Sequence, residues 1–276
     1  MRTHADACRQ TETYMRKPAL LAPRLSSSQG LYRFKTGIPE LDKALNGGIP
    51  AKLTVAVMND PENDVSTFCQ QFIWEGLKSG DVCVYFCYDH HPQTIRENMA
   101  LFGWDTKPYE DRMDFILVDC YSARTGERGK EKHWLERPFE PQRLVEMFRT
   151  LEREVSILKP NRPARVVLDS FSALIEVLNY LEIHRVVLKL QGLCKKGNYV
   201  GIGVMHKGIH GQMNEFIAKH TSEGVIELYS RVERKKLRQF MRVSKMSLTR
   251  FDSTEIPYII TEQGLTVTGK PEPALD

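Results

Sequence analysis

The sequence predicts an α/β protein with a mostly parallel central sheet, helices on both faces of that sheet and antiparallel hairpins at its C-terminal end. Short apolar runs alternate with segments of helical periodicity, which is typical of a parallel sheet that is buried on both faces. The last part of the chain holds short strands with no helix between them, which indicates antiparallel pairing. The 276 residues, 41% hydrophobic and 27% charged, are enough to bury a sizeable core.

Five strands and four helices alternate in this prediction. The strands lie at residues 53–58, 82–88, 114–118, 165–168 and 200–205, and the helices at residues 66–78, 92–102, 141–158 and 178–196. The C-terminal strands are expected in the stretches GVIELYSR, RQFMRVSKM, PYIIT and GLTVTG. Residues 122–138 and 206–216 are expected to be mobile loops at the carboxyl edge of the sheet, where open parallel sheets bind ligands.

The chain is predicted to hold one domain between two tails. Residues 1–33 have no sustained periodicity and end near a Ser/Gly cluster, so a flexible N-terminal tail or an interaction arm is expected there. Residues 34–268 form the domain, and residues 269–276 form a C-terminal tail. The six cysteines are scattered without a CxxC pair, no apolar run approaches a membrane span, and no secretory signal is visible. A reduced cytoplasmic protein without a membrane partner is predicted.

Six stretches, taken in order, resemble the KaiC/RadA-like branch of the RecA-fold ATPases. They are TGIPELDKALNGGIP at 36–50, ENMALFGWD at 97–105, RVVLDSFSAL at 165–174, GVIELY at 224–229, RVSKM at 242–246 and YIITEQGLTV at 258–267. The third stretch resembles the Walker B strand, followed by the pair Asp169 and Ser170. The resemblance implies a RecA-like P-loop NTPase core and often a hexameric ring that binds nucleotide between neighbouring subunits.

The phosphate-binding loop of that family falls on the stretch NDPENDVS at residues 59–66. Such a loop needs GxxxxGK[ST], because glycines let backbone amides approach phosphate, lysine supplies charge and the hydroxyl binds magnesium. The residues at these positions are Asn59, Glu62 and Asp64 in place of glycines, Val65 in place of lysine, and Ser66 with Thr67 at the hydroxyls. Only Ser66 keeps its expected role, so the Walker A motif is degenerate.

The energetic cost of these changes is large. A charge-assisted hydrogen bond contributes about 1.5–3 kcal/mol. A carboxylate ~4 Å from a phosphate charge costs about 4 kcal/mol at an effective dielectric of ~20. Since ~1.4 kcal/mol is one decade of affinity, tight ATP binding in the family's pose is not expected. No cofactor is therefore predicted, and ATP with magnesium enters only if the loop retains weak binding.

Two other positions depart from the family pattern. Asp89 and His90 stand where the family has a Glu-Glu pair that activates the attacking water. Aspartate is shorter, and histidine is a weaker, pH-dependent base. Near the end of the chain Lys245 is kept, but Ser247 replaces the arginine that reaches a neighbour's phosphate. Asp169 is intact at the Walker B position, and no catalytic residue is predicted.

Asp64 has a structural interpretation. It directly precedes a helical pattern and is predicted to cap that helix by accepting a hydrogen bond from the amide of Ser66 or Thr67. Its carboxylate would then fill the positive end of the helix that phosphate normally neutralises. Histidines at 90, 91, 206 and 210 lack any regular ligand spacing, so ordinary loop histidines are expected and no metal is predicted.

The stretch SRVERKKLRQFMRVSKMSLTR at residues 230–250 is strongly basic. Its candidate contacts are Lys235, Lys236, Arg238, Arg242 and Lys245. They would line a subunit interface or meet a nucleic-acid backbone, and aromatic residues for base stacking are sparse. A solvated hairpin or an interface is the simpler interpretation.

The favoured function is a KaiC/RadA-like pseudo-ATPase, which acts as a regulatory or scaffold protein in a ring with itself or with an active paralogue. One alternative is a DNA-binding recombinase paralogue that works without hydrolysing ATP itself. The basic hairpin supports this alternative. Another is a weak ATPase that uses an unusual lysine such as Lys52 or Lys207. A homo-oligomer or a hetero-oligomer with a RecA-like paralogue is the expected partnership.

Overall fold

The computed structural model describes residues 30–233 and 235–269. The predicted N-terminal tail up to residue 29 and residues 270–276 of the predicted C-terminal tail lie outside these ranges. A compact unit begins at Tyr32, which is followed by a small antiparallel pair of strands, β1 (Arg33–Phe34) and β2 (Ile49–Pro50). The short helix α1 (Pro39–Ala44) lies between these two strands in the chain.

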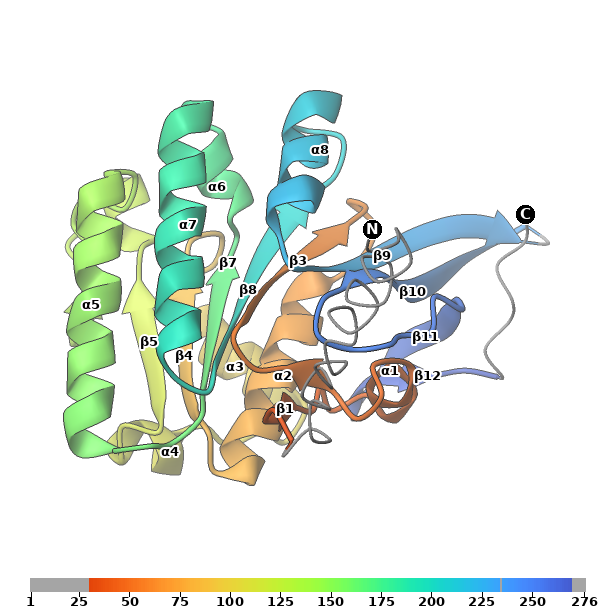
Figure 1. The fold of residues 1–276 in the computed structure, drawn as a ribbon, viewed down its shortest axis with the longest axis horizontal. Coiled ribbons are helices and arrows are strands. Elements are labelled where there is room, and N and C mark those ends of the chain that lie inside the picture. Colours follow the sequence, from red (N-terminus) through yellow and green to blue (C-terminus); the bar gives the residue numbers. More distant parts are fainter. Residues whose placement is uncertain (1–29, 234, 270–276) are drawn as a thin grey trace, which may run out of the picture. The chain divides into compact units, whose positions relative to one another are not determined.

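A ten-stranded mixed sheet runs through this unit (Figure 1). Its spatial order is β12-β11-β10-β9-β3-β8-β7-β4-β5-β6. The strands from β9 to β6 are parallel, and β9 to β12 continue the sheet with antiparallel pairing. The strands are β3 (Leu53–Asn59), β4 (Val82–Cys87), β5 (Phe115–Asp119), β6 (His133–Trp134), β7 (Ala164–Asp169), β8 (Tyr199–His206), β9 (Gly224–Glu233), β10 (Lys236–Met246), β11 (Ile256–Thr261) and β12 (Gly264–Val267).

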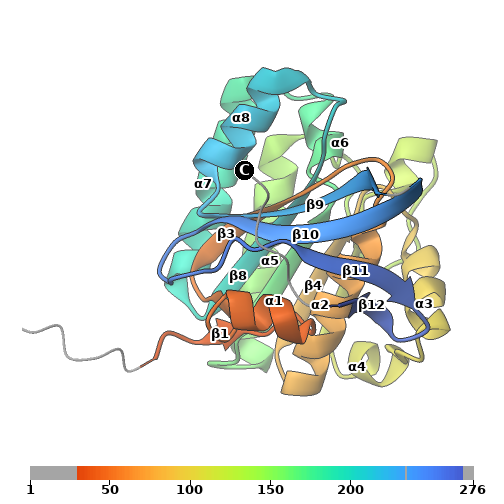
Figure 2. The same cartoon turned by 90° about the vertical axis from the view of Figure 1, so that its right-hand side faces the viewer.

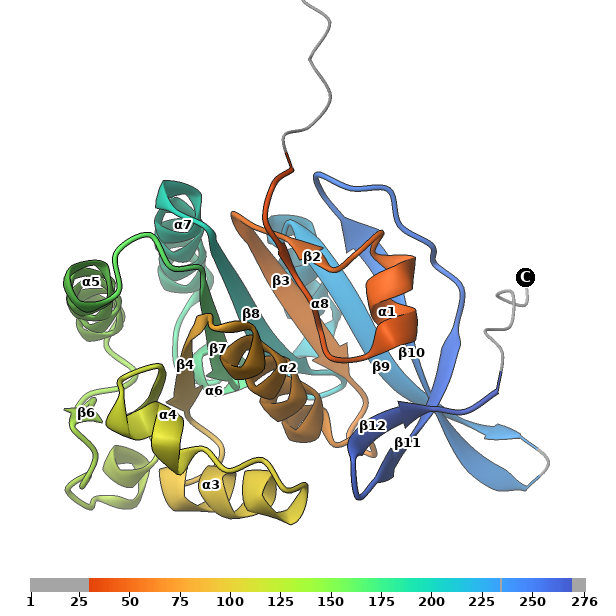
Figure 3. The same cartoon turned by 90° about the horizontal axis from the view of Figure 1, so that it is seen from below.

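Helices cover both faces of the parallel part, with α2 and α3 on one face and α5 and α7 on the other (Figure 3). The strands between them are almost wholly apolar because they are enclosed on both sides. Apart from α1, the helices are α2 (Val65–Ser79), α3 (Pro92–Leu101), α4 (Lys107–Asp111), α5 (Pro141–Leu158), α6 (Ser172–Ile175), α7 (Tyr180–Lys196) and α8 (Gly211–Thr221). The predicted fold class is thus confirmed, and each predicted strand and helix of the alternating part ends within two residues of its expected bound.

Both segments that were predicted to be loops contain regular structure. Residues 206–216 run into helix α8, which begins at Gly211 and has no buried residue, so the chain carries no strong apolar period there. Residues 122–138 hold a 3₁₀ turn and the edge strand β6, which pairs with β5. His133 of β6 is buried and its Nε2 lies 2.9 Å from Glu154 of α5. This segment is therefore ordered by tertiary contacts, which no local sequence pattern predicts.

A buried ion pair joins the start of the unit to the sheet. The side chains of Arg165 on β7 and Asp81 are each 1% exposed, and their Nε and Oδ2 atoms lie 2.8 Å apart. The Arg165 guanidinium also donates to the carbonyls of Lys35 and Phe72, while the Tyr32 hydroxyl donates to Asp81. Burial, followed by this hydrogen bond, raises the pKa of Tyr32 to about 12. The two charges are thus paired and almost fully hydrogen-bonded, which is the condition for burying them.

Candidate functional site

The degenerate loop connects the end of β3 to the start of α2, at the carboxyl edge of the parallel sheet. Strands β8 and β9 flank β3 on either side, so residues after β8 lie beside the loop. Among them, Lys207 donates its amide to the carbonyl of Asn59. The sheet topology therefore places the loop where open α/β sheets bind their ligands.

Asp64 is the N-cap residue of α2, as predicted. Its Oδ1 accepts from the amide of Thr67 at 3.1 Å, and its Oδ2 accepts from the hydroxyl of the same residue at 2.6 Å. A carboxylate therefore occupies the positive end of the helix, which favours negative charge. A second acid of the loop, Asp60, forms an ion pair with Lys207 at 2.5 Å and accepts from the amide of Ser230.

Replacing Asp64 by alanine is expected to lower the free energy of unfolding by about 1 kcal/mol, because the Thr67 amide loses its acceptor. Glu62 is the matched control, since it is an exposed acid of the same loop and Glu62→Ala is expected to change stability by less than about 0.5 kcal/mol. Urea unfolding of both variants measures the difference. Equal effects of the two substitutions would show that the cap contributes nothing.

Several backbone amides of the loop are engaged within the protein. The amide of Asp60 donates to the carbonyl of Leu228, that of Asn63 to Asp60, and that of Val65 to Asn63. The Thr67 amide is taken by the Asp64 cap. A phosphate-binding loop needs its amides to point at the ligand. In this loop, four amides in or next to the phosphate position already have protein acceptors.

His206, at the end of β8, bridges the loop to the neighbouring strand end. Its Nδ1 lies 3.0 Å from Oδ1 of Asn59, and its Nε2 lies 3.1 Å from Oδ2 of Asp89. The Asn59 side-chain nitrogen donates to the carbonyls of Asp60 and Asn63, so its oxygen is left to accept. Both ring nitrogens of His206 therefore face acceptors, an arrangement that favours the protonated form of the ring.

The electrostatic environment agrees with this charge state. The hydrogen bond to Asp89 raises the pKa of His206 above its usual value, against the opposing effect of burial. Burial alone would raise the pKa of Asp89, but hydrogen bonds from His206 and Ser170 outweigh it and leave that pKa lowered. Arg124 adds a second cation, 3.2 Å from the Asp89 carboxylate. A carboxylate held in this way is a weak base.

A pH dependence follows for the His206 bridge. Because the folded-state pKa of His206 is raised, its contribution to stability is complete below about pH 6.5 and is lost as the pH rises through the folded value. His206→Gln is expected to cost about 1–2 kcal/mol near pH 6 and to cost less at higher pH. Urea unfolding between about pH 5.5 and 8.5 measures the trend. Asp89→Asn should abolish the same trend, and a cost of His206→Gln that grows with pH would contradict it.

Asp169, the Walker B residue, lies at the end of β7 and is 1% exposed. Its Oδ2 accepts from the hydroxyls of Ser66 at 2.7 Å and Tyr85 at 2.5 Å. Burial raises the pKa of this carboxyl above its usual value. The carbonyl of Asp169 accepts from the amide of Asp89, so the Walker B strand end and the Asp89–His90 pair are adjacent.

The five basic candidate residues of the hairpin fall into two groups: some are bonded within the protein and others are exposed. Lys245 donates to the carbonyls of residues 219, 220 and 222 at the end of α8, and Arg242 is paired with the buried Glu227 at 2.7 Å. Lys235, Lys236 and Arg238 are exposed at the hairpin end. Strands β9 and β10 run side by side (Figure 2), and their hairpin extends beyond the other strands of the sheet (Figure 3). Only these three of the five candidate residues are thus placed to meet a partner freely.

Neither lysine that could have served an unusual ATP site is suited to it. Lys52 precedes β3, at the end of that strand opposite to the loop, so it does not lie beside the loop of its own chain. Lys207 lies beside the loop, but its charge is engaged by Asp60. With three acids, no free lysine and several engaged amides, the residues of this loop do not fit the triphosphate of ATP.

His206 is the site residue whose role the sequence did not reveal. The sequence indicates only an ordinary loop histidine at this position. In the described part of the chain, no three metal-ligating side chains gather in one place. His91 instead caps α3 by accepting from the amide of Gln93. The feature that marks His206 is its position at the end of a strand beside the loop. This position follows from the pairing of β8 with β3, which the sequence alone does not give.

The fold and this loop define a RecA-like P-loop protein, and the chain belongs to the KaiC ATPase family, whose model matches residues 34–272. Among relatives, it is 32% identical over 242 residues to a UPF0273 protein of Pyrococcus horikoshii, covering 85% of this chain and 93% of the relative. A UPF0273 protein of Thermotoga maritima is 30% identical over 239 residues, covering 85% and 95%.

A solved structure supports the fold independently. The crystal structure of a KaiC-like protein from Pyrococcus horikoshii matches with a TM-score of 0.70 and 24% identity, covering 87% of this chain and 100% of that chain. Within the described residues, no helix combines the length and apolar character needed to cross a membrane.

Proposed function

We propose that this protein is a KaiC-family member that does not hydrolyse ATP and that acts as a regulatory or scaffold protein, in a ring with itself or with an active paralogue. The observation that carries this proposal is the internal bonding of the degenerate loop. The amides of Asp60, Asn63, Val65 and Thr67 donate to protein acceptors. The helix end that would bind phosphate carries the carboxylate of Asp64.

The catalytic side of the site supports the same proposal. A general base must accept a proton from water, and its efficiency falls as its pKa falls. Asp89 is held by His206 and Arg124, and its pKa is lowered. Ser247 stands where an arginine would reach a neighbour's phosphate, and a serine cannot supply that charge.

The test is calorimetric titration of the full chain with ATP and ADP in the presence of magnesium. No saturable binding is expected at nucleotide concentrations up to about 1 mM, because losing the lysine and adding acids removes several decades of affinity. Micromolar binding of ATP to the unaltered chain would overturn the proposal. Light scattering on the same samples measures whether the chain assembles with itself.

A restored variant serves as the matched control. Asp64→Gly combined with Val65→Lys removes the capping acid and supplies the missing lysine in front of Ser66. We expect this variant to bind ATP at least about tenfold more tightly than the unaltered chain. If neither protein binds, the fold rather than the loop chemistry blocks the site, and the argument from the loop fails.

The cytoplasm is the location that we propose, supported by the cysteines. Cys69, Cys83, Cys87, Cys120 and Cys194 are all buried free thiols in the described part of the chain. Free buried thiols are typical of proteins in reducing compartments. Non-reducing electrophoresis of freshly isolated protein tests this, since a mobility change on reduction would argue for an oxidising compartment.

A second candidate function is binding to a nucleic-acid backbone. It is favoured by the exposed basic side chains at the end of the β9–β10 hairpin. Lys235, Lys236 and Arg238 are exposed there, and among the described residues only Arg238 of these three has an acidic neighbour, Glu233 at 3.4 Å. Sequence-independent binding of this kind weakens steeply with salt. Binding to single-stranded DNA that is lost with added salt, and in Lys235→Glu/Lys236→Glu, would support it. Equal binding by the variant would refute it.

A further inference from the structure

The central sheet is incompletely covered on the face that carries α5, α7 and α8. Parallel strands in the middle of a sheet are normally buried on both faces. Here Thr54 of β3, Gly201 and Gly203 of β8 and Val166 of β7 are only half-buried. Thr54, Gly201 and Val166 are direct neighbours across the three strands. They therefore form one row of partly uncovered positions across the middle of the sheet.

The two glycines create this opening. Alternate residues of β8, which are Val200, Ile202 and Val204, point to the other face and are fully buried. On the open face, residues 201 and 203 have no side chain to fill the space under α7. A Cβ added to either glycine would meet its nearest neighbour at 3.5 Å, which is an ordinary contact. Backbone crowding therefore does not explain the glycines, and the hollow that they leave is real space.

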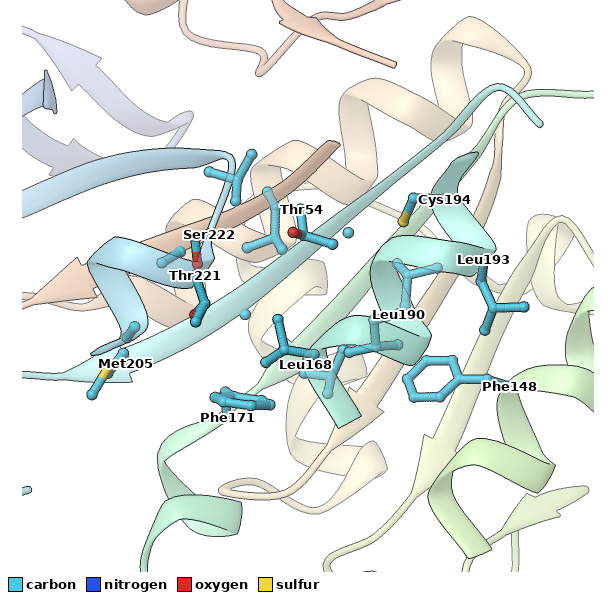
Figure 4. A pocket seen from close by; sticks show the side chains of 18 of the residues that line it. Thr54, Phe148, Leu168, Phe171, Leu190, Leu193, Cys194, Met205, Thr221 and Ser222 are labelled. Carbon is cyan, nitrogen blue, oxygen red and sulfur yellow. The ribbon is translucent and has the colours of Figure 1, made fainter. Parts of the chain in front are cut away.

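The hollow is an apolar slot of about 120 Å³ between the sheet and helices α5, α7 and α8 (Figure 4). An engineered apolar cavity of about 150 Å³ stays dry and binds benzene. Phe148 and Leu193 lie toward one end of the slot, and the hydroxyls of Thr54, Thr221 and Ser222 gather toward the other. The slot is thus apolar along most of its length and polar at the end next to α8.

The charges around the slot exclude an ionised ligand. The described residues that line it include no lysine or arginine. Near the hydroxyl end, the Glu223 carboxylate accepts from the amide of Thr54, and Lys195 is already paired with that carboxylate. Glu152, which lines the slot, is paired with Lys196. An anion would find no free cation, so a neutral head group suits the hydroxyl end.

We propose that this slot is a binding site for a neutral compound with a short alkyl chain, whose polar end lies near Thr54, Thr221 and Ser222. A chain of about six carbons matches a space of nearly benzene-binding size. Helix α8, which has no buried residue, forms one wall. The site lies on the face of the sheet opposite to α2 and is independent of the degenerate loop and of the function proposed for it.

The test is calorimetric titration of the full chain with 1-hexanol, together with thermal unfolding. We expect saturable binding with a Kd in the millimolar range or tighter, and a rise in Tm of about 2–4 °C at high occupancy. Hexanoate is expected to bind at least about tenfold more weakly, because its charge meets Glu223 without a free cation. The absence of saturable binding, or hexanoate binding as tight as that of hexanol, would overturn the proposal.

Variants of the two β8 glycines that line the slot make the test specific. Gly201→Ala combined with Gly203→Ala places two methyl groups in the slot without a close contact. We expect this variant to fold and to bind 1-hexanol at least about tenfold more weakly. Gly192→Ala on α7 is the matched control, since nothing lies within 4 Å of its added Cβ and its residue is exposed. It should bind as the unaltered chain does, and equal binding by all three proteins would refute the site.

Discussion

Replacing Arg165 by methionine is expected to lower the free energy of unfolding by about 3–5 kcal/mol, because the substitution leaves Asp81 buried and charged without its partner. The pair is 1% exposed on both sides, so water cannot replace the lost cation. The carbonyls of Lys35 and Phe72 lose their donor as well. Urea unfolding at pH 7 measures the change.

Two comparisons separate charge burial from packing. Arg165→Met combined with Asp81→Leu removes both charges and is expected to recover most of the loss, since apolar replacement of a buried pair is often neutral or stabilising. Asp111→Asn breaks the exposed pair with Lys107, where the side chains are 59% and 74% exposed, and should cost less than about 1 kcal/mol. If the single and double variants at 165 and 81 were equally unstable, loss of packing rather than an unpaired charge would be the cause.

Glu227 is expected to make the second largest single contribution among the charged residues. This β9 carboxylate is 4% exposed and is bound by Lys219 at 2.6 Å, Arg242 at 2.7 Å and the Ser244 hydroxyl at 2.8 Å. Burial opposes its ionisation, but these three donors lower its pKa to about 2. Relative to an unfolded value near 4.3, this amounts to about 3 kcal/mol at neutral pH.

The pH dependence of this contribution has a definite sign. Because the folded pKa of Glu227 is depressed, its stabilisation is complete above the unfolded pKa and is lost as the pH falls through the folded value of about 2. Glu227→Gln should therefore cost about 2–3 kcal/mol at pH 7 and progressively less below about pH 4.5.

Urea unfolding at several pH values tests the Glu227 prediction. Glu146, whose carboxylate is 59% exposed and pairs with Arg143, provides the control, because Glu146→Gln should have little effect at any pH. A cost of Glu227→Gln that stays constant down to pH 2 would mean that the shape of the side chain, and not its charge, is what matters.

The fold could be predicted from the sequence because the alternating part repeats a strong local signal. The strands from β3 to β8 are continuous apolar runs, and α2, α3, α5 and α7 carry a helical apolar period between them. Asp64 as a cap was also local information, since a helix pattern begins directly after it. Helix α8 was missed because none of its residues is buried, so no apolar period marks it in the sequence.

The functional details that the sequence missed are all long-range pairings. His206 and Asp89 are 117 residues apart in the chain, and Arg165 is 84 residues from Asp81. Nothing local distinguishes His206 from the other histidines, and an arginine within a strand usually reaches solvent. The absence of a lysine at position 65 can be read from the sequence, but the Leu228 carbonyl that accepts from the Asp60 amide is brought to the loop only because β9 adjoins β3.

The buried arginine also constrains how this sequence can change over evolution. Gly76 lies on the face of α2 that packs on Arg165, and a Cβ at that position would clash with the Arg165 Nε. No side chain can enter at position 76 while the guanidinium stays, and a smaller residue at 165 would leave Asp81 without its cation. Positions 76, 81 and 165 are therefore expected to covary as a triplet among relatives that keep this architecture, because a change at one is tolerated only with changes at the others.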